Sequence, residues 1–587
     1  MDLIRPVVMA INASGLPTAR RVAAALDCPL HGREGRTDGC DATFPNALDH
    51  ARDLFAAGHA VVGVCAAGIL IRAVAPLLSD KRAEPPVLSV SDGGGVVVPL
   101  LGGHHGANRL ARRIADALGG TAAVTTAGDV ALGAALDEPP PGHVLANPDD
   151  ARTAMAALLE GGGARQVGGR LFDLPDGDAV ELVTTDAPEP GGPTRLVYHP
   201  RRFVLGMGCA RDAQPDEAWR NARAVLMAAG VAPGAVACVA TLDLKLDEPA
   251  LHHVAARLGC PLRAFDAEAL AGIAVPNPSE AVRAEVGTPS VAEAAALMAT
   301  GGALVHAKRK SAATTAALAR ADAPIVAMPG RGRGRLSIVG IGPGRADWRT
   351  PEASHLIAQA DELVGYTLSL DLLGPLAAGK PRADFPLGGE SDRCAHALEA
   401  AGKGRDVALV CSGDAGIYAM AALVHELIDR RAVSDAARRV EIVTAPGVSA
   451  LQAAAARSGA LLGHDFCAVS LSDLLTPRDD ILRRLRAAAE GDFVVALYNP
   501  VSRRRRTLLD EARTILLTGR GPETPVVLAT DLGRPAETAR LRTLGTLETD
   551  EVDMLTVVLV GSSHSRVVRT GDGLRAYTPR GYAAKWE

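Results

Sequence analysis

Short apolar runs of strand length alternate with Ala-rich segments of helical periodicity along this 587-residue chain. Residues 7–11 precede a helical pattern at 18–26, and residues 60–65 precede another at 69–78. Strands that alternate with helices are typical of α/β proteins with parallel sheets. Because domains average roughly 150 residues, a chain of this length predicts about four units. We therefore expect a multidomain α/β protein.

The composition is that of a globular protein, with 48% hydrophobic and 22% charged residues. A net charge of −5 gives the whole molecule no attraction for nucleic acid or for anionic membranes, so local Arg clusters must hold any polyanionic ligand. The nine Cys contain no C-x-x-C pair, which indicates reduced thiols rather than a disulfide framework or a zinc site. Residues 1–6 do not resemble a signal peptide, and the most apolar stretch, 60–71, is about half as long as a membrane span. We expect a cytoplasmic protein with neither nucleic acid nor membrane as a partner.

Three polar segments rich in Pro and Gly, at 137–142, 186–193 and 329–334, are typical of joints between domains. They predict a first α/β domain at 1–136, a middle region at 137–200, a second α/β domain at 201–328, a linker at 329–335 and a last unit at 336–587 with a lobe break near 445–450.

The last unit contains five apolar strand patterns joined to turns of small residues, at 335–344, 407–418, 442–450, 493–500 and 552–561. The first turn reads G-x-G-x-G rather than G-x-G-x-x-G, and Pro343 removes a backbone donor from it. It therefore differs from a phosphate-binding dinucleotide loop, although a ligand without phosphate does not need one. In the third motif, Ser449 is expected to cap the following helix.

The order and spacing of these five motifs resemble the tetrapyrrole methylase family, the class III S-adenosylmethionine-dependent methyltransferases. Segments 344–353, 461–466, 470–477 and 498–505 are similar to one branch, the precorrin-3B C(17)-methyltransferases. The resemblance implies two stacked α/β lobes with S-adenosyl-L-methionine held in the crevice between them, and a homodimer formed through this half. It also implies methylation of a corrinoid precursor at carbon 17, with ring contraction, in cobalamin biosynthesis.

The resemblance further implies which residues bind the ligands. Main-chain atoms are implied to make many of the contacts with the cofactor, and small residues let the backbone come close to it. Gly342 and Pro343 are implied to contact the substrate. The implied cofactor contacts are Ser412, Gly413, Asp414, Ile417, Thr444, Ala445, Tyr498, Asn499, Leu555, Thr556 and Val557.

Methyl transfer from a sulfonium requires donor and acceptor to be held in line and water to be excluded, and no dedicated nucleophile is expected. Ring contraction calls for an acid or base near the macrocycle. Asp414 is the first catalytic candidate, followed by Tyr418 and His464. In that role, Asp414→Asn is expected to reduce turnover while leaving cofactor affinity nearly intact. Asp414 also fits a turn acid bonded to nearby amides, and His464 fits a structural role.

The substrate is a polycarboxylate, so basic side chains should surround its rim. Arg503 and Arg504 begin a run of four Arg that is expected to open a helix, where the helix dipole disfavours cations unless an anion is bound. A solvated helix face is the alternative. No metal site is expected, because the adjacent His104 and His105 point apart and no third ligand is suitably spaced.

Residues 1–330 resemble the cobalt-precorrin-5A hydrolase family, which opens a lactone, in segments 64–81, 102–111, 204–209, 241–249 and 287–296. The resemblance implies two further α/β lobes. His104 is the candidate acid or base, Asn108 would bind the carbonyl, and Lys245 or Glu248 would contribute from the other lobe. Only Gly106 separates His105 from Ala107, where the family usually has two glycines, and this shortening re-aims the loop.

Two alternatives remain beside a bifunctional fusion. The first keeps the methyltransferase fold but changes the acceptor to another corrinoid carbon or an RNA ribose, and the RNA version should carry a basic face. The second treats residues 1–330 as a non-catalytic corrinoid-binding module that passes intermediates to the methyltransferase half, with hand-off to other enzymes of the pathway. Macrocycles with and without cobalt both fit the sequence.

Overall fold

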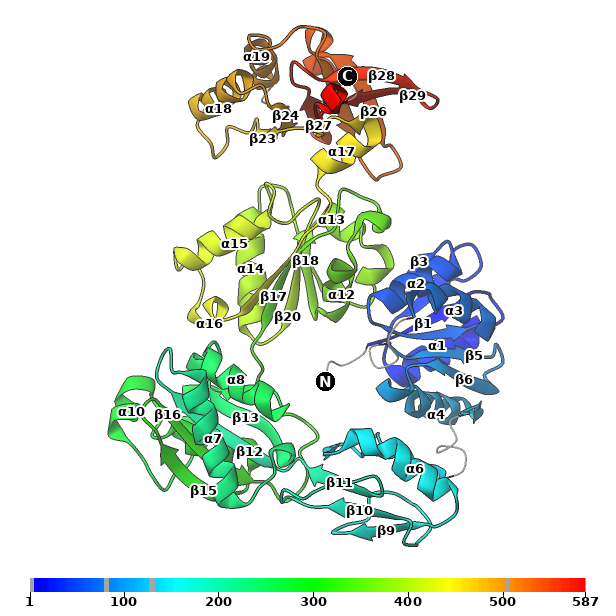
Figure 1. The fold of residues 1–587 in the computed structure, drawn as a ribbon, viewed down its shortest axis with the longest axis vertical. Helices are drawn as coiled ribbons and strands as arrows, with labels where there is room; N and C mark the ends of the chain where they lie inside the picture. Colours follow the sequence, from blue (N-terminus) through cyan, green and yellow to red (C-terminus); the bar gives the residue numbers. More distant parts are fainter. Residues whose placement is uncertain (1–4, 79–83, 126–131, 503–505, 586–587) are drawn as a thin grey trace.

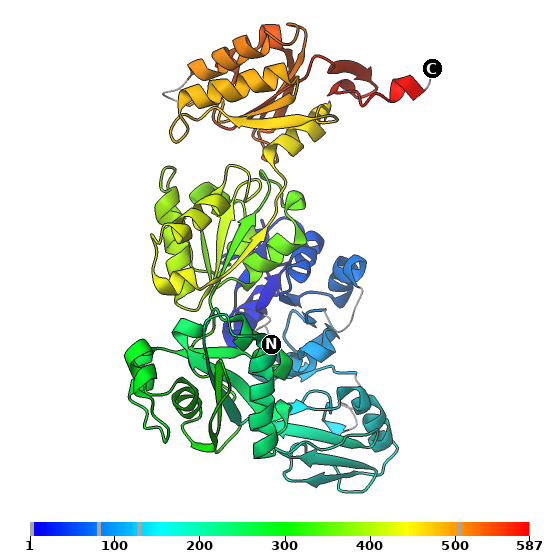
Figure 2. The same ribbon diagram turned by 60° about the vertical axis from the view of Figure 1, so that its left-hand side comes forward.

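The computed structural model describes residues 5–78, 84–125, 132–502 and 506–585, except for the side chains of His104, Ala583 and Ala584. The chain forms a succession of sheets, each flanked by helices, and the C-terminal lobe lies at one end of the molecule (Figures 1 and 2). The α/β class predicted from the sequence is confirmed. Within the described ranges, no helix has the length and apolar character needed to cross a membrane.

The first unit is built on a seven-stranded sheet of order β3-β2-β1-β4-β5-β6-β7. Strands 1 to 5 are parallel, whereas β6 runs antiparallel to β5. The turn between those two strands, residues 91–95, is too short for the crossover that a parallel pair requires. The elements are β1 (Pro6–Ala10), α1 (Leu16–Leu26), β2 (Leu30–Arg33), β3 (Ala42–Phe44), α2 (Ala47–Ala56), β4 (Ala60–Val64), α3 (Ala67–Val74), β5 (Val87–Val90), β6 (Val96–Leu101), η2 (Gly103–His105), α4 (Ala107–Leu118) and β7 (Thr121–Ala122).

The middle unit has its own four-stranded sheet, of order β8-β11-β10-β9, covered by α6 (Ala151–Leu159). Tyr198 is fully buried in its core, and its hydroxyl donates to the Leu136 carbonyl at 2.8 Å. The strands are β8 (His143–Leu145), β9 (Ala164–Val167), β10 (Val180–Thr184) and β11 (Arg195–Pro200).

The third unit has a five-stranded sheet of order β14-β13-β12-β16-β15, in which β16 is antiparallel to both of its neighbours. The buried faces of β12 and β13 form its core with α7 and α8. The elements are β12 (Phe203–Cys209), α7 (Pro215–Ala229), β13 (Val236–Leu242), η5 (Asp243–Lys245), α8 (Pro249–Leu258), β14 (Leu262–Phe265), α9 (Ala267–Ala271), α10 (Glu280–Val286), α11 (Val291–Thr300), β15 (Ala303–Lys310) and β16 (Thr314–Arg320).

A fully parallel sheet of order β19-β18-β20-β17-β21 forms the next unit, which we call the first lobe. Its helix α12 begins at a cap, because Thr350 Oγ1 accepts from the Ala353 amide at 3.1 Å and Pro351 occupies the first turn. The elements are β17 (Arg335–Gly340), α12 (Pro351–Gln359), β18 (Glu362–Tyr366), α13 (Thr367–Asp371), β19 (Arg382–Phe385), α14 (Glu390–Gly402), β20 (Asp406–Cys411), α15 (Met420–Asp429), α16 (Asp435–Arg438) and β21 (Glu441–Ala445).

The second lobe follows β21 and contains a mixed sheet of order β23-β24-β27-β25-β26 with a small sheet, β22-β29-β28, beside it. The strand β27 is antiparallel to β24 and β25, so its start lies at the same edge as their ends. The elements are α17 (Ala450–Ser458), β22 (Gly459–Ala460), β23 (Phe466–Ser470), α18 (Arg478–Glu490), β24 (Val494–Tyr498), α19 (Thr507–Leu516), β25 (Pro525–Thr530), β26 (Thr538–Thr543), β27 (Thr556–Val560), β28 (Arg566–Thr570) and β29 (Gly573–Tyr577).

Two local expectations differ from the structure. The strand expected at 552–561 begins only at Thr556, because the Asp553 carboxylate accepts from the Leu555 amide at 2.9 Å and from Thr556 Oγ1 at 2.6 Å and so holds a turn. The helix expected to open with the Arg run begins after Arg506, which pairs with Asp550 at 2.7 Å. Arg503 and Arg504 lie outside the described residues.

The first unit packs on the first lobe. Arg5 donates to the Ala360 carbonyl at 2.9 Å and pairs with Asp361 at 2.5 Å. Ala57, which follows α2, is buried in the same apolar cluster as Ala353 and Ile357 of α12. The N-terminal half and the C-terminal half are therefore joined by more than the linker.

Three buried histidines predict a pH-dependent stability of the first unit. Burial lowers the pKa of His31 and His59 to about 4 and that of His50 to about 3. The unfolded chain, with His pKa values of about 6.5, binds protons between pH 6.5 and 4 that the folded unit excludes. The stabilisation is therefore complete above about pH 6.5 and is lost as the pH falls toward 4, on the order of 3 kcal/mol for His31 alone.

Amide hydrogen exchange in β1 and β4, corrected for intrinsic rates, should show lower opening free energies at pH 4.5 than at pH 7.5. His50→Phe is the matched control, since His50 stacks on Phe44 with ring centroids 4.4 Å apart and Phe keeps that contact. Its pH dependence should be shallower. An equal loss of protection in both proteins would contradict the prediction.

Candidate functional site

Three strand-end loops meet at the carboxyl edge of the first-lobe sheet. Gly342 follows β17 and Gly413 follows β20, and their backbones form a pair of hydrogen bonds. The Gly413 amide nitrogen lies 2.8 Å from the Gly342 carbonyl oxygen, and the Gly342 amide nitrogen lies 3.1 Å from the Gly413 carbonyl oxygen. Gly447 follows β21 and packs against Gly413 and against Gly340 at the end of β17. A side-chain carbon on Gly447 would lie 2.2 Å from the Gly413 carbonyl oxygen, so only glycine fits there.

Gly413 has a left-handed backbone, with φ of +73°, and the side on which its Cβ would project is open. Ser412 and Thr444 beside it are exposed, whereas Ala445 is buried beneath the loops. These loops therefore expose main chain and small side chains at the sheet edge.

Asp414 ties two of the loops together. Its Oδ1 accepts from the Gly416 amide at 2.8 Å, and its Oδ2 accepts from the Gly447 amide at 3.0 Å. Both carboxylate oxygens are thus engaged with main-chain donors. This arrangement favours the turn-acid interpretation of Asp414 over proton transfer.

The second lobe contributes Tyr498 and Asn499 from the end of β24. The Tyr498 hydroxyl lies 2.5 Å from Ser449 Oγ and accepts from the Leu451 amide at 3.1 Å, at the start of α17. Burial raises the pKa of Tyr498, and the nearby Asp414 charge raises it further. Asn499 has a left-handed backbone, and its side chain donates to Ser470 Oγ at 3.1 Å.

Tyr418 bridges the two lobes. Its hydroxyl donates to the Ala468 carbonyl of β23 at 3.0 Å, and its ring lies 5.2 Å from that of Tyr498. Burial raises its pKa. Its φ of +52° is strained for a residue with a side chain, and such strain is concentrated at functional sites. We call the region around the two tyrosines and the glycine loops the lobe junction; Figure 1 shows the second lobe beyond the carboxyl edge of the first.

The start of β27 completes the set of implied cofactor contacts. Thr556 and Val557 are buried, and Thr556 Oγ1 lies 2.8 Å from Thr530 Oγ1 at the end of β25. The preceding turn leaves Met554 and Leu555 exposed. Those two side chains, with Ile417 and Tyr418, are between 38% and 55% exposed. These exposed apolar side chains leave apolar surface available to a ligand.

His464 does not reach the lobe junction edge. It precedes β23, whereas Asn499 follows the parallel strand β24, so the two residues lie at opposite edges of the sheet. Its Nδ1 accepts from the Asp465 amide at 2.8 Å, which fits a structural role.

The candidates in the N-terminal half lie in separate units. In the first unit, His104 lies in η2 and Asn108 lies in α4, on either side of Gly106, and the side chain of His104 is not described. Lys245 ends η5 of the third unit. Helices α4 and α8 lie well apart in Figure 1. Among the described residues no group of three or more His, Cys, Asp and Glu could hold a metal ion.

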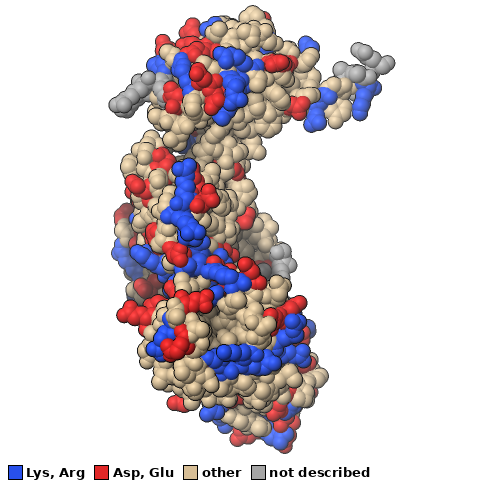
Figure 3. Space-filling view, turned by 90° about the vertical axis from the view of Figure 1, so that its left-hand side faces the viewer, with Lys and Arg blue, Asp and Glu red and all other residues tan. Residues whose placement is uncertain are grey.

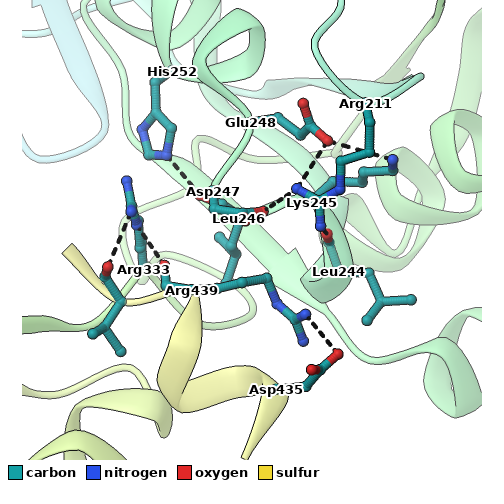
Figure 4. Close-up of polar contacts among 11 residues, drawn as sticks. Arg211, Leu244, Lys245, Leu246, Asp247, Glu248, His252, Arg333, Asp435 and Arg439 are labelled. Atoms are coloured by element: carbon teal, nitrogen blue, oxygen red, sulfur yellow. Dashed lines mark hydrogen bonds and ion pairs between the residues drawn. The ribbon is translucent and has the colours of Figure 1, made fainter. Parts of the chain in front are cut away.

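Lys245 belongs to a charged network near the joint with the first lobe (Figure 4). Its Nζ lies 3.5 Å from Glu248, a buried carboxylate that also pairs with Arg211 at 3.1 Å. Arg211 pairs with Asp247 at 2.8 Å as well. The sequence suggested Lys245 and Glu248 but gave no sign of Arg211, which lies 34 residues upstream of Lys245 and joins them only in the fold.

Sequence reasoning also missed the contact of Trp348 with the second lobe. The Arg457 guanidinium lies 4.6 Å from the Trp348 ring centroid and pairs with Glu537 at 2.6 Å, and Glu537 accepts from the Gly533 amide at 2.6 Å. An Arg and a Trp more than a hundred residues apart carry no local signal of this contact.

Three family models match the chain. The model for Cobalamin synthesis G N-terminal matches residues 49–129, and that for Cobalamin synthesis G C-terminus matches residues 203–319. The model for Tetrapyrrole (Corrin/Porphyrin) Methylases matches residues 335–548. The two resemblances inferred from the motifs are confirmed.

Individual relatives agree with these matches. The Precorrin-3B C(17)-methyltransferase of Sinorhizobium sp is 45% identical over 251 residues, which are 43% of this chain and 98% of that protein. The Probable cobalt-factor III C(17)-methyltransferase of Salmonella typhimurium is 42% identical and covers 42% of this chain and 99% of its own. The solved structure of the methyltransferase CobJ is 38% identical, covers 42% of this chain and 100% of its own, and has a TM-score of 0.39. Residues 335–548 carry the defining match and the glycine-lined lobe junction, so the chain belongs to the tetrapyrrole (corrin/porphyrin) methylase family, with cobalamin synthesis G segments preceding that domain.

Proposed function

We propose that residues 336–587 methylate carbon 17 of precorrin-3B, or of its cobalt form, with ring contraction, as a step of cobalamin biosynthesis. The observation that carries this proposal is the 45% identity to a Precorrin-3B C(17)-methyltransferase along 98% of that relative's length. The family-model match over residues 335–548 includes the glycine loops and both tyrosines of the lobe junction. Small exposed loops at a sheet's carboxyl edge are the usual position of a ligand in α/β proteins.

S-adenosyl-L-methionine, when bound, supplies an electrophilic methyl group on a sulfonium. The backbone from Ser412 to Asp414 and the side chains of Ile417 and Leu555 would hold it, together with Thr444 and Tyr498. Asp414 acts here as a positioning residue, because it fixes the Gly447 loop against the Gly413 loop.

The lobes must stay in contact while donor and acceptor are aligned, since in-line displacement tolerates little misplacement. Tyr418 provides that contact, through its hydroxyl on the Ala468 carbonyl and its ring against that of Tyr498. Gly342 and Pro343 are proposed to face the macrocycle, and Arg503 and Arg504, outside the described residues, to meet its carboxylates.

The N-terminal half is proposed to be a cobalt-precorrin-5A hydrolase-like module of the same pathway. Asn108 lies on α4 and Lys245 lies shortly before α8, and the distance between these helices in Figure 1 favours the alternative in which the N-terminal half holds a corrinoid without turning it over. We further propose a cytoplasmic homodimer formed through the methyltransferase half, with hand-off of intermediates to other corrin-pathway enzymes.

The direct test incubates the full chain with S-adenosyl-L-methionine and a panel of precorrins, with and without cobalt. Mass spectrometry should detect one added methyl group on precorrin-3B or its cobalt form, and fragmentation should place it at carbon 17. Methylation of another carbon would favour the alternative acceptor. Absence of any methylated product, with no calorimetric binding of S-adenosylhomocysteine, would refute the proposal.

Asp414→Asn should raise the KM for S-adenosyl-L-methionine about tenfold and lower kcat less. An amide has one acceptor oxygen, so one of the two glycine amides loses its partner, and a hydrogen bond to a charged group contributes about 1.5–3 kcal/mol. Asp429→Asn, at the exposed end of α15, is the matched control and should behave as the wild type. A collapse of kcat at unchanged KM would instead identify Asp414 as an acid or base.

Gly447→Ala should abolish measurable binding of S-adenosylhomocysteine, because the new carbon collides with the Gly413 carbonyl and forces the loops apart. Gly521→Ala is the control, since a carbon there meets no atom within 4 Å. Calorimetry reports the affinity, and exchange in the third unit reports whether the rest of the chain stays folded. Normal affinity in Gly447→Ala would place the cofactor elsewhere.

A further inference from the structure

A hollow of about 480 Å³ lies in the third unit, away from the lobe junction. It sits where β12 and β13 end and where α11 begins, and the turn between β15 and β16 closes its other side. The carboxyl edge of parallel strands is the position at which α/β sheets commonly bind ligands. The residues that carry the argument are Lys245, Val282, Val286, Ser290, Lys308 and Lys310.

Ser290 supplies a polar group that nothing in the fold satisfies. It precedes the ten-residue helix α11 and lines the hollow with only 2% of its surface exposed. Its Oγ is buried and has no hydrogen-bond partner among the described residues, and it does not cap its own helix. Buried hydroxyls nearly always have partners, so this one indicates a missing ligand. The helix start adds unpaired amides and a positive dipole end, both of which favour an anion.

Cations line the same hollow. Lys308 donates to the neutral Asn277 carbonyl, and Lys310 is exposed at the end of β15. Within the described ranges neither lysine is ion-paired with a carboxylate. Burial lowers the pKa of Lys308, the buried Glu293 carboxylate, which accepts from the Lys308 amide at 3.0 Å, raises it, and the charge of Lys310 lowers it. Figure 3 faces the side on which α10 and β15 lie and shows Lys and Arg gathered in a band across its lower half.

The remaining cations are already partly neutralised, because Arg211 and Lys245 share Glu248 (Figure 4). Glu285 is the carboxylate among the lining residues. Glu293, buried in the first turn of α11, offsets part of the charge of Lys308, so Lys310 carries the least balanced charge, on the side of the β15–β16 turn.

Apolar side chains form the other wall. Leu242, Val282, Val286 and Val291 line the hollow from β13, α10 and α11. An inorganic anion gains nothing from such a wall, whereas a large organic acid buries apolar surface against it. The combination fits a ligand with carboxylates on an apolar frame.

We propose that this hollow is a second tetrapyrrole-binding site of the chain, in which a carboxylate of the macrocycle meets Ser290 Oγ, the first amides of α11 and the two lysines. The ring edge lies along Val282 and Val286. The choice of a tetrapyrrole rests on the proposed function of the chain, whereas the location and the anionic chemistry rest on the third unit alone.

The test uses the full chain and uroporphyrin I, a tetrapyrrole with eight carboxylates, in a fluorescence titration. Lys310→Gln and Ser290→Ala should each weaken one binding event about tenfold, as expected for loss of a charge-assisted hydrogen bond. Lys310 is exposed, so its variant should fold even if Ser290→Ala does not. Arg152→Gln, an exposed cation of α6 in the middle unit, is the charge-matched control and should bind as the wild type.

Each outcome decides between sites. Unchanged uroporphyrin binding in both variants would overturn the inference, while methyl transfer could still be intact. If inorganic phosphate competed for the hollow with the same affinity as uroporphyrin, the hollow would be a simple anion site. That result would also overturn the inference. If the wild type lacks methyl transfer but the variants still weaken binding, the proposed function fails and this site stands.

Discussion

The packing of three strand-end loops in the first lobe is the constraint on which the candidate site depends. Gly340, Gly413 and Gly447 bring the backbones after β17, β20 and β21 within a distance that no side-chain carbon permits. The Asp414 carboxylate then fixes two of these loops by accepting an amide from each. Because the loops hold one another, the main chain at the sheet edge is preorganised before any ligand arrives, which reduces the ordering cost of binding.

The N-terminal half and the methyltransferase half are also linked by contacts around the linker. The segment from η5 to α8 lines the hollow with Lys245, and its Asp243 pairs with Arg331 of the linker at 3.3 Å. Arg331 in turn donates to the Gly402 carbonyl of the first lobe at 3.3 Å. Arg333 donates to the Arg439 carbonyl at 2.7 Å from the same joint (Figure 4). One short segment therefore lines the hollow and is connected to the methyltransferase half through Arg331. This contact gives the fusion a fixed geometry at the linker, where the sequence alone predicts flexibility.

The sequence was sufficient for the features set by local pattern. Alternating strands and helices predicted the α/β class, and the five motifs predicted which loops lie at the lobe edges, because strand ends and glycine turns are encoded by neighbouring residues. It was not sufficient where distant residues decide. The antiparallel strands β16 and β27 and the contact of Arg457 with Trp348 depend on how segments far apart in the chain pack. The role of Asp414 was open for the same reason, since one of its partners, Gly447, lies 33 residues away.

The two sites use the same position in a sheet with opposite chemistry. At the lobe junction the strand ends present glycine backbone and exposed apolar side chains, which suits a cofactor whose reactive centre is a cation that nearby Lys or Arg would repel. In the third unit the strand ends present lysines, a helix start and an unsatisfied hydroxyl, which suits carboxylates. Methyl transfer still requires the macrocycle to meet the sulfonium at the lobe junction, so the hollow in the third unit would hold a macrocycle apart from the place of reaction.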